Sequence, residues 1–166
     1  MLPDRALNFI LLTHPRELAK SSNTGQLVLD LPDIVSTRIV WSRTEADPDL
    51  LMQIERGGVW LAWPGGEASG TDVECHTCIV IDATWQEARK IYNRSPYLQS
   101  LPTVSPQAVQ PSSYTLRRNQ VECGLSTAEC VAAILDEVGS AAEAKALLQA
   151  LEKMQAIWRR GRGSIT

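Results

Sequence analysis

A chain of 166 residues suits a single folded domain, here expected over residues 1–166, and its 44% hydrophobic content is enough to build a core. No run approaches the roughly 20 apolar residues that span a bilayer, and the N-terminus lacks signal-peptide features, so we expect a cytoplasmic protein without membrane partners. The formal net charge of -3 argues against a protein that coats nucleic acid, because phosphate binding usually requires a basic surface.

The first half of the chain alternates predicted strands with predicted helices. Four segments are apolar or rich in β-branched residues and end at turn residues, which is typical of strands. These predicted strands are residues 7–13, 37–41, 58–63 and 78–81. Helix-compatible patterns at 25–31 and 48–56 lie between them. This alternation predicts an α/β fold with a mostly parallel sheet flanked by helices.

The fourth predicted strand stops abruptly at Asp82, and strong helix formers fill residues 84–93. Asp82 would then lie at the carboxyl end of a strand, where open α/β sheets bind their ligands. Thr84 is placed to cap the helix, whose N-terminal amides and positive dipole end favour an anionic group. The alternative interpretation is that Asp82 itself caps this helix and stabilises a turn.

The segment that follows this helix contains four prolines and several serines between residues 95 and 113. We expect an irregular connection there, with a short strand within 101–104 as the alternative. Further on, Ser126 is followed three residues later by Glu129, which has the form of a capping box and predicts the start of another helix.

Basic residues gather in three places despite the acidic total. The clusters are Arg89, Lys90 and Arg94, then Arg117 and Arg118, and finally Arg159, Arg160 and Arg162. The last follows a predicted long amphipathic helix at 141–158, and we expect residues 158–166 to form a flexible basic tail. Each cluster is either a solvated helix face or, if folding brings two of them to the Asp82 site, a patch that holds an RNA backbone.

Four cysteines raise the question of a metal site. Cys75-His76-Thr77-Cys78 has the spacing of a zinc half-site, but Cys123 and Cys130 have six residues between them and do not form a second half. We therefore expect no metal, and we expect Cys78 and Cys130 to be buried as small apolar residues.

Four blocks of the chain together resemble the DTW-domain family. Asp82-Ala83-Thr84-Trp85, followed by Ala88 and Lys90, resembles the Asp-x-Thr-Trp motif of that family. Three more blocks stand in the family's order: His14-Pro15-x-Glu17-x-x-Lys20-x-x-Asn23-Thr24-Gly25, Leu61-x-x-Pro64, and Tyr114-x-Leu116-Arg117 with Leu125-Ser126-Thr127-x-Glu129. The resemblance implies a SPOUT-like fold with a C-terminal trefoil knot.

The resemblance also implies an activity. Members of the family transfer the 3-amino-3-carboxypropyl group of S-adenosylmethionine to N3 of a uridine in tRNA, which gives acp3U and methylthioadenosine. Because the sulfonium is a good leaving group, the enzyme chiefly positions the reactants and assists loss of the N3 proton. Asp82 and Trp85 are the expected catalytic residues, with Asp82 acting as base, as cofactor anchor or as balance to the sulfonium. Two alternatives stay open: a SPOUT-type RNA methyltransferase and a non-catalytic tRNA-binding module.

Site residues are expected in the matching blocks, whose turns at Pro64, Asp82 and Ser126 would converge on one ligand. The expected cofactor-binding residues are Leu61, Trp63, Pro64, Gly65, Asp82, Thr84, Trp85, Leu125, Ser126 and Thr127. The expected tRNA-binding residues are His14, Glu17, Lys20, Asn23, Lys90, Arg117 and Arg118. The alternative for Trp85 is packing against the sheet, and that for His14 is a hydrogen-bonded structural role. A monomer and a homodimer are equally compatible with the sequence.

Overall fold

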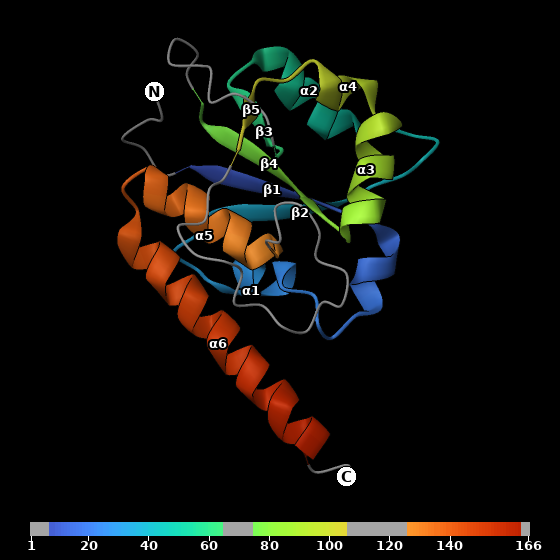
Figure 1. Ribbon diagram of the computed structural model, residues 1–166. Coiled ribbons are helices and arrows are strands. Elements are labelled where there is room, and N and C mark those ends of the chain that lie inside the picture. The colour runs from blue at the N-terminus through green and yellow to red at the C-terminus, as the bar shows by residue number, and fades with distance from the viewer. Residues whose placement is uncertain (1–6, 65–74, 106–125, 164–166) are drawn as a thin grey trace.

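A five-stranded sheet forms the centre of the computed structural model, which describes residues 7–64, 75–105 and 126–163 (Figure 1). The strand order is β2-β1-β4-β3-β5, and every neighbouring pair is parallel. The strands are β1 (Asn8–Thr13), β2 (Ser36–Val40), β3 (Val59–Ala62), β4 (Thr77–Asp82) and β5 (Thr103–Val104). The predicted α/β fold with a mostly parallel sheet is confirmed, and the short strand proposed within 101–104 is present as β5.

The two central strands, β1 and β4, run in register along their whole length. Asn8 pairs with Thr77 at one end, and Thr13 pairs with Asp82 at the other. Helices cover both faces of these strands, which explains why their sequences read as nearly continuous apolar runs. The register has one consequence for the site, since it places the last residues of β1 and β4 side by side.

Helices form a layer on each face of the sheet (Figure 1). On one face lie α2 (Pro48–Arg56), α3 (Trp85–Asn93) and α4 (Pro96–Gln99). On the other lie α1 (Gly25–Asp30), α5 (Thr127–Glu137) and α6 (Ala141–Gly163). A short 3-10 helix, η1 (Pro15–Ala19), follows β1. Within the described ranges, no helix is both long enough and apolar enough to cross a membrane.

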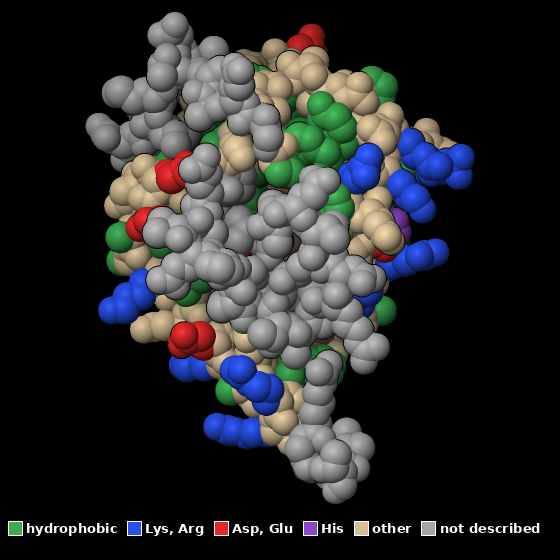
Figure 2. Space-filling model, in the orientation of Figure 1, with side chains coloured by type: hydrophobic (Ala, Val, Ile, Leu, Met, Phe, Trp, Pro, Cys, Tyr) green, Lys and Arg blue, Asp and Glu red, His purple; other side chains and the backbone are tan. Residues whose placement is uncertain are grey.

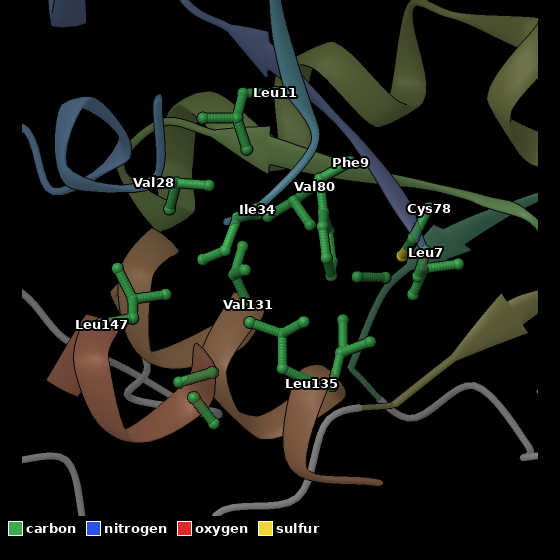
Figure 3. Close-up of a cluster of buried hydrophobic side chains, with 14 of the residues drawn as sticks. Leu7, Phe9, Leu11, Val28, Ile34, Cys78, Val80, Val131, Leu135 and Leu147 are labelled. Atoms are coloured by element: carbon green, nitrogen blue, oxygen red, sulfur yellow. The ribbon is translucent and has the colours of Figure 1, made fainter. Parts of the chain in front are cut away.

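Each face of the sheet has its own hydrophobic core. Side chains that alternate along β1 divide between them: Phe9 and Leu11 point to the α1, α5 and α6 layer, whereas Ile10 and Leu12 point to the α2, α3 and α4 layer. Figure 3 shows the first core, in which side chains of the sheet point toward Val131 of α5 and Leu147 of α6. The same alternation along β4 points Asp82 toward α1 and α5, away from α3.

Both predicted helix starts are confirmed as capping boxes. Thr84 and Glu87 bond reciprocally at the start of α3, and Ser126 and Glu129 do the same at the start of α5. The alternative that Asp82 caps α3 is wrong, because Thr84 provides that cap and the Asp82 side chain lies on the opposite face of the sheet.

Two segments are more regular than the sequence predicted. The expectation of an irregular connection from residue 95 is wrong at its beginning, where α4 starts with Pro96 at a position that requires no amide donor. The last helix, α6, continues to Gly163, beyond its predicted end at residue 158, because the arginines there are good helix formers.

The cysteines of the described segments are buried or partly buried. Burial raises the pKa of the Cys75 thiol to about 11 and that of Cys78 well above its usual value. Cys78 packs in the core on the α5 side, as predicted, and Cys130 is partly buried against the same core. Cys75 and Cys78 are therefore poorly reactive structural residues.

Candidate active site

Asp82, the last residue of β4, is fully buried and is the acceptor of several hydrogen bonds. Thr13 Oγ1 donates to its Oδ2 at 3.1 Å, and Thr127 Oγ1 donates to its Oδ1 at 2.8 Å. The amide Nδ2 of Asn23 donates to both oxygens, at 2.9 and 3.0 Å. Arg38 Nη2 completes the shell 3.5 Å from Oδ2. The carboxylate thus joins β4 to β1, β2, α5 and the segment before α1.

This shell explains how a carboxylate can be buried at all. Moving an unpaired charge out of water is strongly unfavourable, but hydrogen bonds from neutral donors and a nearby guanidinium offset much of that cost. Since both oxygens of Asp82 are occupied by protein donors, accepting a proton from a substrate would break part of the shell. The geometry therefore favours a positioning role for Asp82 over a role as general base.

Gly25 and Thr24 fit closely around this carboxylate. A β-carbon at Gly25 would lie 2.5 Å from Asp82 Oδ2, which is far inside van der Waals contact. Thr24 is fully buried, and its Oγ1 accepts a hydrogen bond from the Ala128 amide in the first turn of α5, at 3.1 Å. The block Asn23-Thr24-Gly25 is thus required for α1 and α5 to pack around Asp82.

A polar network leads from Asp82 to the surface. Asn23 Nδ2 also donates to Glu17 Oε1 at 3.2 Å, so one amide bridges two buried carboxylates. Glu17 Oε2 in turn accepts from Lys20 Nζ at 2.5 Å, and the Lys20 side chain is 40% exposed. On its other side, Asn23 Oδ1 accepts from Arg38 Nη2 at 2.9 Å. Of the residues expected to bind tRNA, Glu17 and Asn23 face the protein interior, and Lys20 reaches solvent.

His14 has the structural role that the sequence left open. Its Nδ1 accepts a hydrogen bond from the Arg16 amide at 3.1 Å and thereby caps η1. Its ring stacks on Trp41 with centroids 6.1 Å apart, and Nδ1 lies 3.5 Å from Glu87 Oε2 at the start of α3. The contact with Glu87 brings η1 beside α3.

Three aromatic rings, Trp63, Trp85 and Tyr92, form what we call the aromatic cluster. Trp63 follows β3, and its ring centroid lies 5.3 Å from that of Trp85 and 4.3 Å from that of Tyr92. All three are half-buried and pack on the α3 side of the sheet, so they combine core packing with an accessible surface. The cluster and the Asp82 carboxylate therefore lie on opposite faces of the sheet, joined by the short turn from Asp82 to Trp85.

The remaining predicted cofactor-binding residues differ in how accessible they are. Leu61 is fully buried in the sheet, whereas Pro64 is half-buried beside Trp63. Ser126 and Thr127 are buried, and they bond Glu129 and Asp82 respectively. That last bond brings Thr127 and Asp82 together, and the convergence of the three turns on one ligand stays a prediction. Four predicted residues lie outside the described residues: Gly65, Arg117, Arg118 and Leu125.

The capping box of α3 also determines the ionisation of Glu87. Burial alone would raise the pKa of Glu87, but bonds from the Thr84 amide and hydroxyl, together with the charges of His14 and Lys20, outweigh it. The pKa of Glu87 is therefore below its usual value. Because Thr84 and Glu87 satisfy each other's groups, this helix end has fewer free amides for an anionic ligand than the sequence suggested.

Sequence reasoning missed two members of the Asp82 shell, Thr13 and Arg38. Thr13 ends a predicted strand, and parallel pairing with the strand that ends at Asp82 was the signal that could have found it. Arg38 lies within β2 and reaches Asp82 from two strands away. The sequence feature that could have drawn attention to Arg38 was its position as a single arginine within a predicted strand of β-branched residues.

Comparisons with known proteins agree on one family. A model described as the DTW domain matches residues 1–159. A curated relative, tRNA-uridine aminocarboxypropyltransferase 2 of Macaca fascicularis, is 30% identical over 98 residues. The matched region covers 55% of this chain and 33% of that relative, so it spans about a third of the relative's length. No solved structure matches the chain.

Proposed function

We propose, from the premise that this chain belongs to the DTW domain family, that it is a transferase that modifies tRNA. The resemblance noted in the sequence is confirmed by the family match over residues 1–159. The finer proposal is transfer of the 3-amino-3-carboxypropyl group of S-adenosylmethionine to N3 of a tRNA uridine, with methylthioadenosine as the second product. The curated relative, whose name describes a tRNA-uridine aminocarboxypropyltransferase, supports this reaction.

The observation that carries the proposal is the meeting of three sequence blocks at one carboxylate. Asp82 belongs to the Asp-Ala-Thr-Trp block, Asn23 and Gly25 to the N-terminal block, and Thr127 to the C-terminal block. These blocks are far apart in the sequence but surround Asp82 in the fold. A chain that had kept only the fold would not need such a closely fitted polar centre.

The aromatic cluster suits S-adenosylmethionine. Aromatic faces stack on adenine and attract a cationic sulfonium, and Trp63 and Trp85 are half-buried rings with Pro64 beside them. We propose that these three residues form the wall of the cofactor site. When bound there, S-adenosylmethionine supplies a carbon activated by the adjacent sulfonium.

Asp82 holds this site in shape, in the role that we propose for it. Its hydrogen bonds fix the start of the turn from residue 82 to Trp85, and Thr84 fixes the end through its capping box. The turn then orients Trp85 against Trp63. Precise orientation of the two reactants is what a transfer with a good leaving group chiefly requires. Asp82 is thus a positioning residue, and Trp85 is the residue that touches the cofactor.

Incubation of purified protein with tRNA and S-adenosylmethionine tests the reaction. The cofactor carries one label in its methyl group and a different label in its aminocarboxypropyl group. We expect the aminocarboxypropyl label in tRNA, with acp3U among the nucleosides by mass spectrometry. Methyl label in tRNA would instead identify an RNA methyltransferase, and tRNA binding without transfer of either label would identify a binding module.

The SPOUT-like relationship and the C-terminal trefoil knot stay part of the proposal. The all-parallel sheet with helices on both faces is compatible with them. Residues 106–125, which connect β5 to α5, lie outside the described residues. A crystal structure of the protein with S-adenosylmethionine would test both the knot and the cofactor wall.

A further inference from the structure

We propose that the surface formed by η1 and α3 binds the phosphate backbone of the substrate RNA beside the candidate site. This inference rests on the proposed function, since it takes RNA as the substrate. We define the basic edge as the exposed cations of these two elements and of the C-cap residues that follow them: Arg16, Lys20, Arg89, Lys90 and Arg94. Figure 2 shows Lys and Arg side chains gathered on the side of the molecule where α3 and η1 lie.

One contact joins the two halves of the basic edge. His14, which caps η1, lies 3.5 Å from Glu87 in the first turn of α3. The two basic segments, far apart in the sequence, therefore form one continuous surface.

The charge of this surface is largely uncompensated. Glu17 and Glu87 are the carboxylates of η1 and α3; Glu17 is buried beneath Lys20, and Glu87 is engaged in its capping box. Within the described part of the chain, no carboxylate lies within ion-pair distance of Arg16 or of the three cations on α3. A local excess of positive charge on a protein with net charge -3 indicates a specific partner that carries negative charge.

The basic edge borders both parts of the candidate site. Lys90 and Arg94 are one turn apart, while Arg89 stands one turn from Trp85 and from Tyr92 on the same side of α3. Arg89 thus places one cation of the edge beside the aromatic cluster, and cations beside aromatic rings hold a single-stranded backbone and stack its bases. At the other end, the His14 amide donates to the backbone oxygen of Asp82 at 3.1 Å. An RNA strand on this edge would bring a base to the turn from Asp82 to Trp85.

A second basic segment supplies a matched control. Arg159 and Arg160 are adjacent, exposed and near the C-terminal end of α6, which extends away from the sheet (Figure 1). Lys90→Gln with Arg94→Gln removes two charges from the basic edge, and Arg159→Gln with Arg160→Gln removes two charges from α6. The two double variants have equal net charge, so any difference between them in tRNA binding results from where the removed charges lie on the protein.

The test is equilibrium binding of tRNA to the whole protein across 50–200 mM salt, measured by fluorescence anisotropy. Each phosphate contact contributes about 0.7–0.9 to the magnitude of the slope of log K against log salt, so we expect the edge variant, which lacks two contacts, to lose roughly 1.4–1.8 from that magnitude. Its affinity should fall about tenfold or more at 0.1 M salt. We expect the α6 variant to keep the wild-type slope, and both variants to keep wild-type S-adenosylmethionine affinity by calorimetry.

The outcomes separate this inference from the proposed function. An edge variant that keeps the wild-type salt slope overturns the inference. An α6 variant whose slope falls as much as that of the edge variant overturns it too. In either case, formation of acp3U by the wild-type protein would still support the proposed function. Conversely, salt-dependent binding through the edge without transfer of any label supports the inference and overturns the proposed activity. A wild-type protein that does not bind tRNA overturns the edge as an RNA surface.

Discussion

Gly25 lies directly against the carboxylate of Asp82, so closely that a β-carbon at position 25 would approach Oδ2 to 2.5 Å. We expect Gly25→Ala to force α1 away from Asp82 and to lower the free energy of unfolding by about 1–3 kcal/mol. Urea denaturation measures the effect. The control is Lys153→Ala, which changes an exposed residue of α6 and should cost less than about 0.5 kcal/mol. Equal stability of the Gly25→Ala variant and wild type would contradict the close fit.

Asp82→Asn keeps the shape of the side chain but removes its charge and turns one acceptor into a donor. The new amide faces Asn23 and Thr127, which both donate to this position. We expect a loss of about 2–4 kcal/mol in unfolding free energy and a fall in transfer rate for the folded fraction. Asp136→Asn, on an exposed residue of α5, is the control. An Asp82→Asn protein with wild-type kcat and stability would show that the charge has no role.

Two substitutions of Thr127 distinguish a positioning role of its hydroxyl from a packing role of its methyl group. Thr127→Val removes the hydroxyl that donates to Asp82 at 2.8 Å, and Thr127→Ser keeps it. We expect the valine variant to lose transfer activity about tenfold or more through kcat, because the Asp82 turn loses a fixed orientation. The serine variant should restore most of it. A serine variant as impaired as the valine variant would point to packing of the threonine methyl group instead.

The lowered pKa of Glu87 predicts that the stability of the protein depends on pH. Its pKa is depressed in the folded protein, so its contribution is present above its unfolded pKa and is lost as pH falls through the lower, folded value. Glu87→Gln keeps a side chain able to complete the capping box but cannot titrate. We therefore expect this variant to lose less stability than wild type between pH 6 and about pH 3. Glu152→Gln, on the exposed side of α6, should follow the wild-type curve in urea denaturation across that range.

Trp85 is expected to contact the cofactor, and Trp60 provides a matched control. Trp60 is buried in the opposite core, and its indole nitrogen has no hydrogen-bond partner among the described residues, so Trp60→Phe loses no polar contact with them. We expect Trp85→Phe to raise the Kd of S-adenosylmethionine about threefold to tenfold and Trp60→Phe to leave it unchanged. Isothermal titration calorimetry gives both values. Equal Kd values for the two variants would remove Trp85 from the cofactor wall.

Local chemistry made much of this fold predictable. The strand that stops at Asp82 and the capping boxes at Thr84 and Ser126 are read from neighbouring residues, because strand ends and helix caps depend on short-range preferences. In the candidate site, Asp82 followed from the same kind of signal, the end of a predicted strand, whereas Thr127 followed from the resemblance of its block to the DTW-domain family.

The shell around Asp82 could not be predicted from such signals. Arg38 reaches Asp82 only because β2, β1 and β4 are neighbours in that order, and strand order is a property of the whole sheet. The placement of Glu17 and Asn23 in the interior was equally hidden, since an exposed tRNA contact and a buried network use the same polar residue types.

The shared amide of Asn23 connects the protein surface to the buried Asp82 carboxylate. Lys20 neutralises Glu17 at the outer end of the network, and Asn23 connects Glu17 to Asp82. A phosphate that drew Lys20 away would leave Glu17 to compete with Asp82 for the Asn23 amide protons. RNA binding would then change the orientation of the turn from Asp82 to Trp85 and with it the affinity for S-adenosylmethionine. By reciprocity, S-adenosylmethionine would change the affinity for RNA by the same factor. Kd values for tRNA measured with and without S-adenosylmethionine should differ in wild type and agree in Lys20→Gln; equal values in wild type would exclude the coupling.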